Sequence, residues 1–119
     1  MTKVFISQPM RGKSEEYILN ERAEIMETAK RVIGVDVEEL PTYFTDHGER
    51  TPLECLAKSI EMLAKADIAI FAKGWDTARG CRIERQCCYW YGIEAVYYSD
   101  LCLSAQNKQE ATHNDSTPA

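Results

Sequence analysis

Short β-type runs alternate with segments of helical periodicity along most of this chain of 119 residues. Apolar, β-branched or aromatic residues gather in four runs, at 3–7, 35–40, 68–72 and 95–98. Since parallel strands need crossover connections about as long as the helical segments between them, the alternation predicts a parallel α/β sheet covered by helices on both faces. We predict a single-domain, flavodoxin-like (Rossmann-like) sheet of four to five strands in the order 2-1-3-4, flanked by helices.

The helical segments carry terminal signals. Ser14 is a predicted N-cap, and Gly34 follows the segment 14–33 at the usual C-terminal position. Thr51-Pro52-Leu53-Glu54 is a capping box with Pro at the first helical position. The helix that follows has a predicted buried stripe made of Leu53, Leu56, Ala57, Ile60, Leu63 and Ala64.

Composition limits the classes of partner. A net charge of -5 argues against a nucleic acid polymer, because phosphate contacts need a basic surface. No apolar run approaches transmembrane length and residues 1–4 lead directly into a strand, so we expect no membrane association and a cytoplasmic location. The five cysteines contain no CxxC pair, which favours reduced thiols. The spacing of Cys81, Cys87 and Cys88 with His113 matches no common zinc site, so we expect no metal.

The chain changes character near its C-terminus. Residues 1–98 hold all the predicted strands and helices and are interpreted as the domain. Beyond Ser99 the composition becomes polar and low in aromatic residues. We therefore expect 99–119 to be a polar C-terminal tail that is mobile or packs on a neighbour.

Two unusual loops follow the first and third strands. In a sheet ordered 2-1-3-4 these strands are neighbours at the switch point, and ligands bind beyond their carboxyl ends. The loops 8–13 and 73–80 are therefore predicted to meet. They and the helix after them carry five of the fourteen basic residues, namely Arg11, Lys13, Lys73, Arg79 and Arg82. With two helix N-termini nearby, this concentration indicates a small anionic ligand.

Glu84 is the least expected residue in the helix predicted over 79–91. At about 100° per residue it lies inside an apolar stripe formed by Ile83, Cys87, Cys88, Trp90 and Tyr91. A carboxylate on a packed face costs desolvation free energy unless it is paired or used. Glu84 is therefore either a functional group or the partner of a nearby cation, for which Arg79, Arg82 and Lys73 are the candidates.

Several motifs together resemble the nucleoside 2-deoxyribosyltransferase superfamily over about residues 3–98. They are Ile6-Ser7-Gln8-Pro9-Met10-Arg11-Gly12 after the first strand, Ala66-Asp67 before the third, and Gly74-Trp75 with Arg79-Gly80-Cys81-Arg82-Ile83-Glu84. The whole set looks like that of short, largely uncharacterised phage and bacterial members. The Arg-Gly loop is similar to that of the 2'-deoxynucleoside 5'-phosphate N-hydrolases, where it holds the 5'-phosphate.

The resemblance implies hydrolysis of the N-glycosidic bond of 2'-deoxynucleoside 5'-monophosphates, without a cofactor. Glu84 would be the nucleophile that attacks C1' of the sugar, and Asp76 would assist at the sugar or the base. The implied substrate-binding residues are Gln8, Pro9, Met10, Arg11, Gly12, Trp75, Arg79 and Gly80. Members of the superfamily commonly complete their sites with a neighbour's residues, so a homodimer or larger homo-oligomer is expected.

Two other functions stay open. One is a nucleoside 2-deoxyribosyltransferase, which would transfer the sugar of an unphosphorylated nucleoside to a free base. The other is a protein that binds a nucleotide or nucleotide-derived signal without turning it over, which Ala78 and Ser59 favour because the superfamily is more acidic at these positions. The irregular segment 41–50 is interpreted as a loop or lid, in which His47 is a candidate contact to the base.

Overall fold

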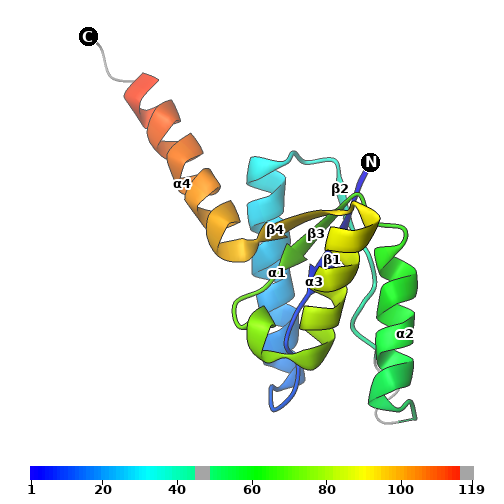
Figure 1. Cartoon of the computed structure of the whole chain (residues 1–119). Coiled ribbons are helices and arrows are strands. Elements are labelled where there is room, and N and C mark those ends of the chain that lie inside the picture. Colours follow the sequence, from blue (N-terminus) through cyan, green and yellow to red (C-terminus); the bar gives the residue numbers. More distant parts are fainter. Residues whose placement is uncertain (45–48, 116–119) are drawn as a thin grey trace.

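The computed structural model describes residues 1–44 and 49–115, with 109–115 as backbone only, and contains one parallel sheet with helices on both faces (Figure 1). Its strands run in the order β2-β1-β3-β4, as predicted. In chain order the elements are β1 (Thr2–Ser7), α1 (Glu15–Val32), β2 (Val37–Glu39), α2 (Pro52–Leu63), β3 (Ile68–Phe71), the 3₁₀ turn η1 (Trp75–Thr77), α3 (Arg79–Tyr91), β4 (Glu94–Tyr97) and α4 (Tyr98–Asp115). No helix in the described part of the chain is both long enough and apolar enough to span a membrane.

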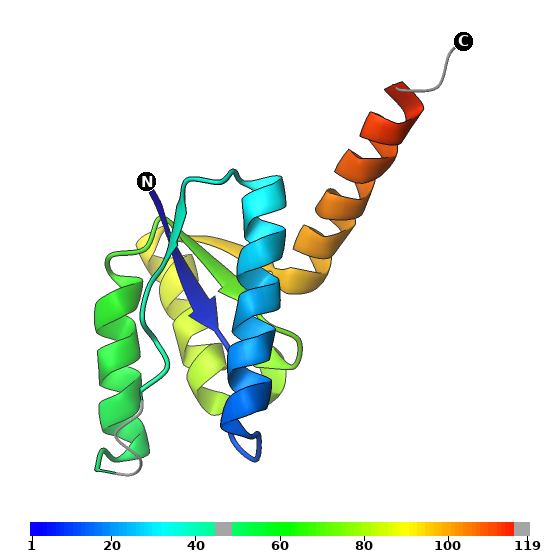
Figure 2. The same cartoon turned by 180° about the vertical axis from the view of Figure 1, so that it is seen from behind.

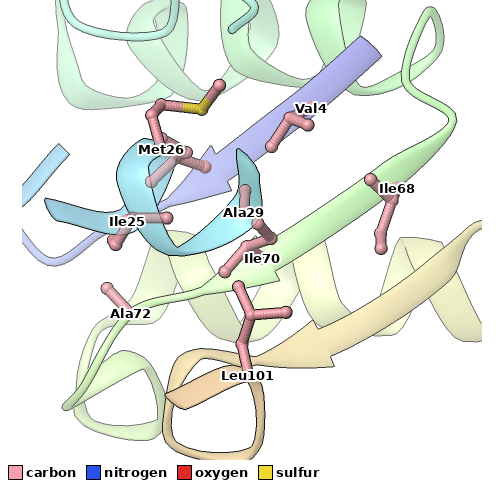
Figure 3. Close-up of a cluster of buried hydrophobic side chains, with 9 residues drawn as sticks. Val4, Ile25, Met26, Ala29, Ile68, Ile70, Ala72 and Leu101 are labelled. Atoms are coloured by element: carbon pink, nitrogen blue, oxygen red, sulfur yellow. The ribbon is translucent and has the colours of Figure 1, made fainter. Parts of the chain in front are cut away.

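The sheet separates two hydrophobic clusters. Val4 and Ile6 of β1 face the α1 and α4 side, where they pack with residues such as Ile25 and Leu101 (Figure 3). Phe5 faces the α2 and α3 side, which Figure 2 shows on the opposite face of the sheet from α1. This alternation follows from the two-residue period of a strand. Ser7 therefore points to the same side as Phe5, toward α2 and α3.

The register of the strands places three side chains in a row at the carboxyl end of the sheet. Ser7 of β1 pairs with Phe71 of β3, and Phe71 pairs with Tyr97 of β4. Paired residues of parallel strands face the same side. Ser7, Phe71 and Tyr97 thus form a row on the face of the sheet that α3 covers.

The predicted helix starts are confirmed. Ser14 accepts a hydrogen bond from the backbone of Tyr17, and Thr51 and Glu54 form a complete capping box. Asp67 accepts a 2.8 Å hydrogen bond from the backbone nitrogen of Lys3 and so ties the start of β3 to β1. This contact gives Asp67 a structural role.

The predicted buried stripes of α2 and α3 are wrong in part. In α2 only Leu63 is buried, and Leu53 is exposed. In α3 the buried residues are Cys81, Glu84 and Cys88, whereas Ile83, Trp90 and Tyr91 are exposed. The line of α3 that touches the sheet runs through positions 81, 84 and 88, so the predicted stripe lies to one side of it.

The segment predicted to be a polar tail forms the helix α4 instead. Leu101 is 4% exposed and belongs to the core, and the hydroxyl groups of Tyr98 and Thr28 lie 3.3 Å apart. Further along, Lys108 donates a 2.8 Å hydrogen bond to the backbone oxygen of Arg31. The side chains of α4 contact the domain as far as Lys108, and the end of the helix projects away from the sheet (Figures 1 and 2). A helix with so little buried surface needs few apolar residues, which is why the sequence pattern did not predict it.

If α4 is an integral part of the domain, truncating Leu101 must cost stability. We expect Leu101→Ala to lower the free energy of unfolding by about 3 kcal/mol through lost burial and a cavity. Leu103 is 58% exposed on the same helix, so Leu103→Ala should change the free energy of unfolding by less than about 0.5 kcal/mol. Urea denaturation followed by circular dichroism measures both. Equal, small effects would mean that α4 does not dock on the domain.

Candidate functional site

The candidate site is built around the carboxyl group of Glu84, in the second turn of α3. Glu84 is 6% exposed and faces the carboxyl end of β1. There the hydroxyl group of Ser7, which is 1% exposed, donates a 2.6 Å hydrogen bond to Oε1 of Glu84. Such short O–H···O⁻ bonds are typical of an ionised acceptor. The end of β1 and the start of α3 together hold this group.

In the described part of the chain no cation neutralises Glu84. Among the described residues none forms an ion pair with it, and the predicted candidates Lys73, Arg79 and Arg82 are exposed. Burial therefore raises the pKa of Glu84 to about 7, and the hydrogen bond from Ser7 opposes this rise. The predicted alternative of a structural ion pair is not what the structure contains.

Two thiols lie near the carboxyl group. Cys81 and Cys88 are buried on the same face of α3, and burial raises the pKa of each to about 11. Both are therefore protonated at neutral pH and add no charge near Glu84. The side chain of Ser7 lies close enough to Cys81 to oppose this rise in its pKa.

The second oxygen of Glu84 remains accessible. Oε1 accepts the only hydrogen bond that the described residues make to this carboxyl group. The described part of the chain also contains no fully buried side-chain oxygen or nitrogen that lacks a partner. Since Oε2 has no hydrogen-bond partner among these residues, it is the oxygen that is not fully buried. The carboxyl group of Glu84 is thus largely shielded from water, and Oε2 is its one atom that is not engaged by a described residue.

The two predicted loops meet beside this group. The backbone nitrogen of Ala72 donates to the backbone oxygen of Ser7 at 2.9 Å, which joins the ends of β1 and β3. Beyond them, Gly74 adopts a left-handed conformation (φ 85°), and a Cβ atom at this position would lie 3.8 Å from Cγ of Pro9. Lys13, at the end of the first loop, is close enough to act electrostatically on Cys81.

Gln8 holds the first loop in place from inside the domain. Its side chain is buried and donates to the backbone oxygen of Ile18 and to Oε1 of Glu21, at 3.0 and 2.8 Å. Its own oxygen accepts a 3.3 Å hydrogen bond from Arg22. The sequence predicted that Gln8 contacts the substrate, but its polar atoms are already engaged with α1. Gln8 therefore anchors the loop, and the backbone at Pro9 leaves the sheet from a fixed position.

Arg22 is a structural residue that the sequence analysis missed. It is buried, pairs with Glu39 at 2.8 Å and donates to Thr42 at 2.8 Å as well as to Gln8. The sequence pattern could have identified it, because Arg22 occupies a position on the apolar stripe of α1 between Ile18 and Ile25. An Arg at such a position indicates a buried polar network.

The rest of the first loop is a turn that faces solvent. The backbone nitrogen of Lys13 donates to the backbone oxygen of Met10 at 3.1 Å, and Gly12 adopts φ 78°, which favours glycine. Arg11 is exposed on this turn. Its side chain is therefore available to a ligand in solution.

The helix N-termini near the site differ from each other. At α3, Ala78 provides no side-chain cap, so the first backbone N–H groups, from Arg79 and Gly80 onward, have no capping partner. At α1 the N-terminus is capped by Ser14 and followed by acidic residues. The sequence analysis predicted two helix N-termini near an anionic ligand. Of these, only the N-terminus of α3 is suited to bind an anion.

Trp75 and Asp76 lie on the other side of Phe71. The ring of Trp75 stacks on that of Tyr97, with centroids 5.3 Å apart, and meets the ring of Phe71 edge-on at 5.5 Å. These residues line a depression of about 520 Å³ at the carboxyl ends of β3 and β4, with Asp76 and Lys73 beside them. Among the described residues that line it, none comes from the first loop, and Glu84 is absent.

The predicted site residues thus form two groups. Glu84 lies with the first loop and the N-terminus of α3, where Arg79 and Gly80 stand. Trp75 and Asp76 lie toward β4, where Tyr97 is a further lining residue that the sequence analysis did not select. His47 lies outside the described residues. No cluster of three or more metal-ligating side chains occurs in the described part of the chain.

Comparison with known proteins adds no further constraint. No family model matches the chain, and neither a curated protein nor a solved structure matches it significantly. The candidate site therefore rests on its own chemistry. A buried carboxyl group with one oxygen held and the other reachable is equipped for nucleophilic or acid–base catalysis.

The burial of Glu84 predicts a pH-dependent cost to stability. Its pKa is raised in the folded state, so the folded protein is relatively most stable when the group is protonated and loses stability as pH rises toward about 7. We expect Glu84→Gln to raise the free energy of unfolding by roughly 2 kcal/mol at pH 8 and to leave it nearly unchanged at pH 4.

Urea denaturation of both proteins at the two pH values measures this difference. The control is Glu38→Gln on the exposed surface of β2, which should alter stability at neither pH by more than about 0.5 kcal/mol. A loss of stability in Glu84→Gln at pH 8 would mean that the carboxylate is a structural requirement instead.

Proposed function

We propose that this protein hydrolyses the N-glycosidic bond of 2'-deoxynucleoside 5'-monophosphates, with Glu84 as the nucleophile. The observation that carries this proposal is the buried carboxyl group, which has no cationic partner among the described residues, whose Oε1 is held by Ser7 and whose Oε2 is not fully buried. A carboxylate in this state can attack C1' of the sugar as the base leaves. Water then releases the sugar phosphate from the enzyme.

The environment of Glu84 suits this role. A carboxylate in a low-dielectric site interacts strongly with the positive charge that develops on the sugar ring in the transition state. Burial raises the pKa of Glu84 to about 7, so the ionised, reactive form increases as pH rises through that value. The rate of base release should follow the same increase.

A 5'-phosphate fits the surroundings of the same helix. Glu84 follows Arg79 by five positions, which corresponds to about 7.5 Å of helix rise. This separation is comparable to the span of a deoxyribose 5-phosphate from C1' to its phosphate. The uncapped N-terminus of α3 supplies backbone N–H donors there, and the exposed Arg11 and the Gly12 turn lie on the adjoining loop.

The same site is also compatible with two other functions. A deoxyribosyltransferase would use Glu84 in the same way but would not need a phosphate. A binding protein that does not turn over its ligand is favoured by the absence of a nearby acid, because Ala78 is apolar and Asp76 lies toward β4. The substrate panel below separates all three functions.

We expect base release from deoxynucleoside 5'-monophosphates, with an acidic limb in the pH–rate profile near pH 7. Glu84→Gln should reduce the rate roughly a thousandfold or more, because it removes the nucleophile and keeps the shape of the side chain. Chromatography of free bases released from deoxynucleotides, ribonucleotides and deoxynucleosides measures both. Release from unphosphorylated nucleosides only when a second base is present would favour the transferase. Saturable binding without release, unchanged in Glu84→Gln, would favour the binding protein.

The role of Arg11 is tested in the same assay. Arg11→Gln should raise KM for 5'-monophosphates roughly tenfold, because one charge-assisted hydrogen bond to phosphate is lost. Its effect on any release from free deoxynucleosides should be small. Lys30→Gln, a matched change in the last turn of α1, serves as the control and should leave KM unchanged. An equal effect of Arg11→Gln on phosphorylated and unphosphorylated substrates would contradict phosphate binding by this residue.

We further propose that the protein is a cytoplasmic homodimer or larger homo-oligomer. The five free cysteines suit a reducing compartment. The amphipathic helices α2 and α3 leave apolar side chains such as Leu53, Ile83 and Trp90 exposed, and a second copy would cover them.

Light scattering at micromolar concentration should therefore give at least twice the mass of one chain. Trp90→Glu should shift the protein toward the monomer, because it places a charge on the proposed interface. Leu19→Glu, at an exposed position of α1 on the opposite face of the sheet, should leave the mass unchanged. A wild-type monomer at this concentration would contradict the assembly.

A further inference from the structure

Among the described residues Ser7 is the one that donates a hydrogen bond to Glu84, and its place in the fold gives it little freedom. It is the last residue of β1 and is 1% exposed, so water does not compete for its hydroxyl group. Its backbone oxygen accepts a 2.9 Å hydrogen bond from Ala72, and its register partner is Phe71. The hydroxyl group is therefore presented to Glu84 from a fixed strand end.

The direction of the hydroxyl proton is also determined. A serine hydroxyl has one proton to donate and can accept in addition. The thiol of Cys81, which lies near Ser7, keeps its own proton at neutral pH because burial raises its pKa to about 11. Ser7 donates its proton to Oε1 of Glu84 at 2.6 Å, and a neutral thiol is only a weak competitor for that proton. Oε2 receives no such bond from the described residues.

We infer that Ser7 is a positioning residue that holds Oε1 of Glu84 and leaves Oε2 as the reacting oxygen. This inference rests on the proposed function. In the first step the Oε2–C1' bond forms as the C1'–N bond breaks, and the electron pair goes to the base, which takes a proton from solvent. In the second step a water oxygen bonds to C1', the Oε2–C1' bond breaks, and the water proton returns to solvent. Ser7 keeps its proton throughout.

Ser7 also favours the ionised form of Glu84. The groups that face this carboxyl group are Ser7 from β1 and the thiols of Cys81 and Cys88 from α3 itself, while Lys13 from the first loop acts on Cys81. Burial raises the pKa of Glu84, and the hydrogen bond from Ser7 is the influence that lowers it. Removing the hydroxyl group must therefore raise the pKa further.

The test reads the carboxyl group directly and does not depend on turnover. Protein labelled with ¹³C at glutamate carboxyl carbons is titrated by NMR, and the signal of Glu84 is assigned by its loss in Glu84→Gln. We expect Ser7→Ala to raise the pKa of this signal by about one unit or more. Ser7→Thr keeps the hydroxyl group and should stay close to wild type. Cys88→Ala removes a buried side chain near Glu84 but no hydroxyl group, and it serves as the matched control.

The second measurement is the pH–rate profile of base release. In Ser7→Ala the acidic limb should move to higher pH by the same amount as the titration, so that the rate at pH 6 falls roughly tenfold. At pH 9 a smaller loss of kcat should remain, because Oε2 is less well oriented. An unchanged pKa in Ser7→Ala, or an equal rise in Cys88→Ala, would overturn the inference. If wild-type protein released no base, the proposed hydrolysis would fail, whereas the titration would still show whether Ser7 holds the carboxyl group.

Discussion

The hydrogen bond between Ser7 and Glu84 is the interaction on which the rest of the site depends. It joins the end of β1 to the second turn of α3, two elements that are 77 positions apart in the chain. For it to form, α3 must turn the line of positions 81, 84 and 88 toward the sheet, and β1 must end with its last side chain on the same face. That rotation keeps the polar contact inside and turns Trp90 outward.

A second buried charge in the same molecule shows what a structural one looks like. Arg22 is surrounded by Glu39, Thr42 and Gln8, and these contacts tie α1 to the end of β2, to the segment after it and to the first loop. Glu84, by contrast, has one neutral hydrogen-bond donor and no opposite charge among the described residues. An uncompensated buried carboxyl group costs stability. Its presence in a molecule whose other buried charge is well compensated favours a functional reason for it.

Much of the fold was readable from the sequence, because the strands are short apolar runs and the helices carry strong capping signals. The order β2-β1-β3-β4 and the burial of Glu84 followed from this pattern. Periodicity could not give the rotation of α3, because Ile83 and Trp90 make an equally apolar stripe beside the line that is buried. It also gave no sign of α4, whose few buried residues include Leu101. Gln8 looked like a ligand contact because motif reasoning gives no direction for a side chain.

Helix α3 carries the features on which the proposed chemistry, ligand binding and assembly depend. Its first turn presents uncapped N–H groups, its second turn carries Glu84, and its last turn exposes Trp90 and Tyr91. The line of positions 81, 84 and 88 and a 3.0 Å hydrogen bond from Arg85 to the hydroxyl group of Tyr97 hold α3 on the sheet. A second copy packed on Trp90 and Tyr91 would cover the outer side of the same helix and so help to keep Glu84 against Ser7. In such an assembly the second copy would support the proposed catalysis by fixing a helix, without any of its residues having to reach the substrate.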